Sequence, residues 1–203
     1  MNFYHNLITE RSWQILKNFK QKYDFILIGG WAVFLYTKSL KSKDIDIILD
    51  YKNLEKIKND FEISKNNRLK KYEIKKEGID IDIYLPFYSN PGLPAEEIKK
   101  YVQKQQGFTV PKPEILLILK QKAYSKRKNS IKGEKDKIDI VALLGLDIDF
   151  KFYWRVLKKY KQENLKKELI ELLKNTFEIP ELNLNKHKFA LFKHLVLKNL
   201  TKI

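Results

Sequence analysis

The sequence predicts an α+β protein, with an α/β half over residues 1–112 and a helical half over residues 113–203. Three observations carry this prediction. An unbroken apolar run, Phe25–Ile28, ends in two glycines, which is typical of a buried strand that turns directly into a helix. Two later stretches alternate isoleucine with aspartate, as strands do. After Pro113 the apolar residues recur at helical spacing.

The elements of the first half follow from the apolar period and from the positions of glycine and proline. In chain order we expect a helix over 8–23, a strand over 25–28, a short helix over 31–36, a strand over 43–50, a helix over 52–61, and strands over 69–75 and 79–85. The proline-containing connection that follows is expected to hold a helix over 95–103 and a short strand over 107–110.

The second half is expected to contain helices only. Apolar spacing predicts them over residues 114–126, 135–144, 150–160, 163–175 and 186–200. Gly133, Gly145 and Pro180 interrupt the pattern between helices.

Composition restricts the classes of function. The 203 residues include 41 Lys+Arg and 25 Asp+Glu, a formal net charge of +16, and 43% are hydrophobic, which is enough for a packed core. The charge favours a polyanionic partner, nucleic acid or a nucleoside triphosphate, although a lysine-biased composition alone also accounts for it. The absence of cysteine excludes disulfides, thiolate zinc sites and cysteine nucleophiles. With no long apolar run, we expect a soluble, cytoplasmic protein without a membrane partner.

Two pairs of aspartates stand out. Asp44 and Asp46 are two apart on an expected strand, so both side chains point to one face, and Asp80 and Asp82 repeat the pattern. If the two strands are neighbours, three or four carboxylates meet, which suits a hard divalent cation such as Mg²⁺ or Mn²⁺. The alternative is that each pair lies on an exposed sheet face without a ligand.

A second signal precedes the acids. Gly29 and Gly30 link the first strand to a helix, where backbone N–H groups can approach an anion because glycine has no Cβ. Lys41, Ser42 and Lys43 lie between these glycines and the acidic strand. Together the two signals predict binding of a magnesium–nucleoside triphosphate, whereas the glycines alone are also typical of a tight turn.

These residues resemble a known superfamily. Gly29-Gly30, Ser42-x-Asp44-Ile45-Asp46 and a later aspartate-bearing strand are similar to the polymerase-beta-type nucleotidyltransferases, over roughly residues 22–86. A second set resembles the abortive-infection (AbiEii) toxin-type nucleotidyltransferases. It comprises Lys120, Ala123, Arg127 and the pair Asp136 and Asp139 after Lys135.

The resemblance implies a minimal nucleotidyltransferase fold, a mixed sheet flanked by helices over residues 1–112, with a helical substrate-binding domain over 113–203. The implied activity transfers a nucleotidyl group from an NTP, such as ATP, to a hydroxyl acceptor on RNA (tRNA-like) or protein. A toxin role would add an antitoxin protein as partner. Asp44, Asp46 and Asp82 would be the catalytic and metal-binding acids, with Asp80 the alternative to Asp82.

The resemblance also implies residues that bind the nucleotide, in addition to the three acids. These residues would be Gly29, Gly30, Ser42, Lys43, Lys120 and Arg127, with Lys41 and Asp136 as further candidates. Lys120 and Arg127 are seven apart and share a helix face, which is also typical of a solvated basic surface. Asp136 would orient Lys120 or the base, or form a salt bridge.

The sequence departs from the family in one place and leaves two other functions open. Many members carry arginines before the first acid, where this chain has only Lys38 and Lys41. This difference bears on the affinity for the triphosphate more than on metal binding. The alternatives are a small-molecule adenylyltransferase and a non-catalytic, basic nucleic-acid-binding module on the same fold.

Overall fold

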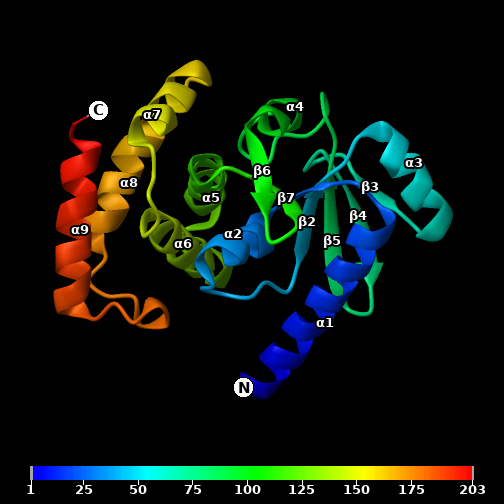
Figure 1. Ribbon diagram of the computed structural model, residues 1–203, viewed down its shortest axis with the longest axis horizontal. Coiled ribbons are helices and arrows are strands. Elements are labelled where there is room, and N and C mark those ends of the chain that lie inside the picture. The colour runs from blue at the N-terminus through cyan, green and yellow to red at the C-terminus, as the bar shows by residue number, and fades with distance from the viewer. Residues whose placement is uncertain (1, 203) are drawn as a thin grey trace. The chain divides into compact units, whose positions relative to one another are not determined.

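The computed structural model describes residues 2–202 and confirms the α+β class (Figure 1). The chain divides into two compact units. The first extends to Lys112 and leaves out Thr37–Leu40, and the second comprises Thr37–Leu40 and the residues from Pro113 onward.

The described part of the first unit is built on a seven-stranded mixed sheet in the order β3-β4-β5-β2-β1-β7-β6. The strands are β1 (Ile26–Ile28), β2 (Ile45–Ile48), β3 (Ser64–Asn66), β4 (Lys71–Lys76), β5 (Ile79–Tyr84), β6 (Val102–Gln105) and β7 (Phe108–Pro111). The pairs β2–β5 and β1–β7 are parallel, and the others are antiparallel. The acid-bearing strands β2 and β5 are therefore central neighbours.

Burial of one face explains why the central strands form. Ile45 and Ile47 on β2, and Ile81 and Ile83 on β5, are all fully buried, while the aspartates between them are partly accessible. The helices of this unit are α1 (Asn2–Lys22), α2 (Gly29–Thr37), α3 (Tyr51–Asp60) and α4 (Ala95–Ile98), the last continued by the 3₁₀ turn η1 (Lys99–Tyr101). The Asp50 carboxylate caps α3 by accepting from the Asn53 N–H.

Two elements of the first unit differ from the sequence prediction. The helix expected to reach residue 103 ends earlier, because Val102–Gln105 forms β6 and turns through Gln106 and Gly107, both at positive φ, into β7. The edge strand β3 was not predicted, because Ser64–Asn66 has no apolar residue and is specified only by its pairing with β4.

The second unit contains α5 (Pro113–Arg127), α6 (Ile131–Leu144), α7 (Phe150–Lys159), α8 (Asn164–Asn175), the 3₁₀ turn η2 (Pro180–Leu182) and α9 (Lys186–Leu200). The prediction that Gly133 lies between helices is wrong, because α6 begins at Ile131 and Ser130 caps it by accepting from the Gly133 N–H. Helix α5 is central and packs against α6, α7 and α8. A buried network ties three helices together: the Tyr153 hydroxyl donates to Gln121 Oε1 (2.8 Å), and Gln121 Nε2 donates to the Leu165 carbonyl (2.9 Å). No helix within residues 2–202 is long and apolar enough to cross a membrane.

Candidate functional site

The register of the sheet brings the two acidic strands together. Asp46 on β2 lies directly beside Asp82 on the parallel strand β5. Asp44, expected on the same strand as Asp46, lies instead in the bend just before β2, because the strand begins only at Ile45. Because parallel neighbours in register point their side chains to the same face, Asp46 and Asp82 project from the face opposite the buried isoleucines.

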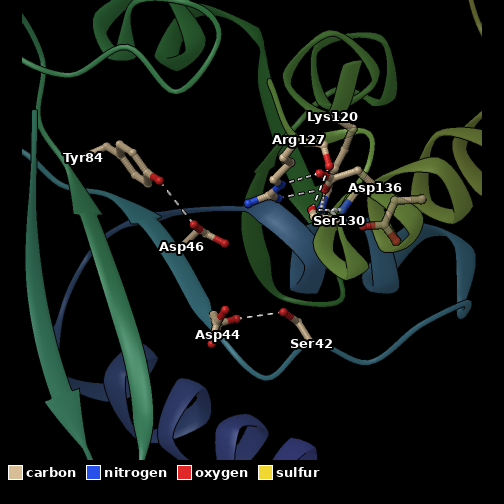
Figure 2. Close-up of polar contacts among 10 residues, drawn as sticks. Ser42, Asp44, Asp46, Tyr84, Lys120, Arg127, Ser130 and Asp136 are labelled. Carbon is tan, nitrogen blue, oxygen red and sulfur yellow. Dashed lines mark hydrogen bonds and ion pairs between the residues drawn. The ribbon is translucent and has the colours of Figure 1, made fainter. Parts of the chain in front are cut away.

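Asp46 is enclosed from two sides. The Tyr84 hydroxyl donates to Asp46 Oδ1 at 3.4 Å, as Figure 2 shows. On the other side a Cβ on Gly29 would lie only 2.1 Å from Asp46 Oδ2, and Gly29 has φ +69°, in the left-handed region. Only glycine therefore allows the carboxylate to approach the start of α2 this closely.

The second glycine has an equivalent role toward Ser42. A Cβ on Gly30 would lie 2.8 Å from Ser42 Oγ. The Ser42 hydroxyl in turn donates to the main-chain carbonyl of Asp44 at 2.9 Å (Figure 2). The glycine pair thus lets the segment 42–46, which carries the first two acids, pack against the first turn of α2.

Asp82 has a cationic partner that the sequence did not reveal. Lys71 Nζ on β4 lies 2.5 Å from Asp82 Oδ2 and 3.0 Å from Glu73 Oε1. Burial raises the pKa of Asp82, and the ammonium of Lys71 offsets part of that rise. Burial lowers the pKa of Lys71, but its hydrogen bonds to Asp82 and Glu73 outweigh this, so its pKa is raised. Because the chain contains many lysines, the sequence alone does not identify Lys71 as the partner of Asp82; the register of β4 and β5 does.

The remaining predicted residues of the first unit lie at the surface. Lys41 forms an ion pair with Glu10 of α1, and Lys43 is exposed. Asp80 is exposed and lies opposite Lys75 of β4. The register thus places Asp82, and not Asp80, beside Asp46.

The predicted cations of the second unit are held in an ion cluster (Figure 2). Arg127 binds Asp136 with two contacts, Nε–Oδ2 at 2.7 Å and Nη2–Oδ1 at 3.0 Å. Lys120 Nζ lies 2.6 Å from Asp139 Oδ2 and 3.3 Å from Asp136 Oδ1. Burial raises the pKa of Asp139, and Lys120 opposes the rise. A role for Lys120 and Arg127 in nucleotide binding stays a prediction.

The donor set suits a metal ion that arrives with a nucleotide better than a metal held by protein alone. Within the described residues, no group of three or more His, Cys, Asp or Glu side chains is arranged to hold a metal ion. Mg²⁺, however, is commonly bound by one or two carboxylates, with substrate phosphates and water completing the octahedron. Asp44 and Asp46 supply two such carboxylates beside the glycine bend, so their chemistry fits that mode.

Comparison with known structures identifies the fold class. The chain is similar to JHP933 from Helicobacter pylori, with a TM-score of 0.51 and 16% identity over 98% of this chain and 93% of that one. It is also similar to a candidate nucleotidyltransferase from H. pylori, with a TM-score of 0.51 and 17% identity over 98% and 96% of the two chains. The chain therefore has a nucleotidyltransferase-like fold.

Sequence comparison adds no finer assignment. No protein-family model matches the chain, and no curated protein matches it. The closer resemblance to abortive-infection toxins stays a prediction.

Proposed function

We propose that the protein is a Mg²⁺- or Mn²⁺-dependent nucleotidyltransferase that moves a nucleotidyl group from an NTP to a hydroxyl acceptor. The observation that carries the proposal is the register that places Asp46 beside Asp82, next to a glycine bend that admits no side chain. The nucleotidyltransferase-like fold supports it.

Each residue has a defined part in the proposed reaction. Asp44 and Asp46 would hold the metal ion that arrives with the triphosphate. When bound, the metal would neutralise phosphate charge and stabilise the transition state of the transfer. The main chain at Gly29 and Gly30, with Ser42, accommodates the polyphosphate. The exposed Lys43, next to Asp44, adds positive charge to the proposed nucleotide site.

Asp82 is the proposed acceptor of the hydroxyl proton. The acceptor oxygen forms a bond to the α-phosphorus, the bond to the β-phosphate oxygen breaks, and pyrophosphate leaves. The acceptor's proton passes to the Asp82 carboxylate. Burial raises the pKa of Asp82, which strengthens it as a base.

The surface of α7 supports an RNA acceptor. Its sequence, FKFYWRVLKK, contains four cations and no acid. Cations lie over partly exposed rings: Lys158 and Lys166 are 5.8 and 4.9 Å from the Trp154 ring centroid, and Lys159 is 5.0 Å from that of Tyr160. Interleaved cations and aromatic rings suit phosphates and unstacked bases.

Labelling tests the reaction directly. The protein is incubated with each of the four α-labelled NTPs, Mg²⁺ or Mn²⁺, and total RNA or cell lysate, and the labelled macromolecule is identified. Asp44→Asn and Asp46→Asn should abolish labelling and the metal-dependent thermal stabilisation by NTPs. Asp82→Asn should abolish labelling, whereas Asp80→Asn should not. Absence of both labelling and NTP stabilisation would contradict the proposal.

A binding test addresses the RNA acceptor separately. Anisotropy of labelled tRNA should show weaker binding by Lys158→Gln/Lys166→Gln than by wild type, with a shallower salt dependence. Lys52→Gln/Lys56→Gln, on exposed positions of α3, removes the same charge elsewhere and is the matched control. Salt-dependent RNA binding without NTP binding would favour the alternative, a non-catalytic nucleic-acid-binding module.

The toxin role is part of the same proposal. Expression of the wild-type protein should arrest growth, and Asp46→Asn should not. Rescue by a protein encoded beside it would identify the antitoxin. Normal growth during expression of an active enzyme would exclude the role.

A further inference from the structure

Lys71, on β4, forms ion pairs with Asp82 of the proposed catalytic face and with Glu73 of its own strand. Its ammonium contacts Asp82 Oδ2 at 2.5 Å and Glu73 Oε1 at 3.0 Å. The side chains of Lys71 and Asp82 are only 12% and 19% exposed, so water screens the pair weakly. This ion pair therefore differs from the exposed pairs elsewhere on the surface.

The backbone fixes this contact. Glu73 on β4 lies opposite Asp82 on β5, and Lys71 is two residues before Glu73 on the same strand face. Asn66 Nδ2, on the edge strand β3, donates to Glu73 Oε1 at 2.9 Å. Lys71 is therefore held between two carboxylates, those of Asp82 and Glu73.

We infer that the ammonium of Lys71 competes with the metal ion for the Asp82 carboxylate. A metal held by Asp44 and Asp46 then gains Asp82 as a third ligand only when Lys71 is displaced. This inference rests on the proposed function. An ammonium and a divalent cation cannot share one carboxylate without repulsion, since both are positive at short range. Lys71 thereby weakens metal binding in the absence of nucleotide.

The same strand offers a matched control. Lys75 is four residues from Lys71, on the same face of β4, and lies opposite Asp80. Lys75 and Asp80 are both exposed. Removing Lys75 deletes one positive charge from the same strand without freeing Asp82.

Mn²⁺ binding without nucleotide, measured by titration calorimetry and by the spin resonance of free Mn²⁺, tests the inference. Lys71→Met should lower the Kd for Mn²⁺ at least about tenfold, whereas Lys75→Met should change it less than about twofold. The double variant Lys71→Met/Asp82→Asn should lose the gain. An unchanged or weaker affinity of a folded Lys71→Met variant would overturn the inference.

A second comparison leaves Lys71 intact, and so does not depend on the folding of its variants. If Lys71 occupies Asp82, then Asp82→Asn should weaken Mn²⁺ binding far less than Asp44→Asn does. Equal losses would show that Asp82 already binds the metal and would overturn the inference. If wild type and every variant fail to bind Mn²⁺ even with an NTP present, the proposed function fails as well.

Discussion

Replacing Gly29 with alanine tests the close approach of the first acidic strand to α2. Gly29 has φ +69°, and a Cβ there would lie 2.1, 2.7 and 2.9 Å from Oδ2, Cγ and Cβ of Asp46. Gly78, in the turn between β4 and β5, is the matched control. It has φ +78°, and nothing lies within 4 Å of the added atom.

Both substitutions carry the same cost in backbone conformation, but only Gly29→Ala adds a steric overlap. A non-glycine residue in the left-handed region costs about 1–2 kcal/mol, and this applies to both positions. Gly29→Ala adds an overlap with a side chain rooted in a central strand, for which overpacking costs about 1–3 kcal/mol. Gly29→Ala should therefore lower the free energy of unfolding by about 1–3 kcal/mol more than Gly78→Ala.

Urea unfolding followed by tryptophan fluorescence measures this difference. In a Trp154→Phe background, the signal comes from Trp13 and Trp31, which both belong to the first unit. Adding Asp46→Ala removes the two closest contacts and should reduce the excess cost of Gly29→Ala. Equal losses at Gly29 and Gly78, or an excess unaffected by Asp46→Ala, would refute the reasoning.

Two further predictions concern buried polar groups. Asp136→Ala should lower the free energy of unfolding by about 1–3 kcal/mol, because the half-exposed Arg127 loses both of its contacts with this carboxylate while the shielded Lys120 keeps Asp139. The exposed Asp147→Ala is the control, and a loss no larger for the Asp136 variant than for Asp147→Ala in urea titrations would contradict this. Burial, and then the hydrogen bond to Asp60, raise the pKa of Tyr23 to about 12. Because the folded value exceeds the unfolded one, its contribution is complete below pH 10 and lost as the pH rises toward 12. The urea midpoint of wild type should therefore fall more steeply over this range than that of Tyr23→Phe, and parallel curves would disprove it.

Local patterns in the sequence determined most of the elements and singled out the aspartates at the two central strands as candidates. Isoleucine alternating with aspartate specifies a strand with one buried face, and this holds for both β2 and β5. The apolar run that ends at Gly29 specifies a buried strand followed directly by a helix, as β1 and α2 show. These signals are carried by adjacent residues, so no knowledge of long-range pairing is needed to recognise them.

Only the tertiary structure decided which polar groups meet. The placement of Asp82 beside Asp46 depends on the parallel register of β2 and β5, and the pairing of Lys71 with Asp82 depends on the antiparallel register of β4 and β5. The reason for two glycines, the close approach of Asp46 and Ser42 to α2, likewise became visible only from distances. Side chains far apart in the chain are brought together by strand order and register, whereas hydrophobic periodicity shows only which face of each strand is buried.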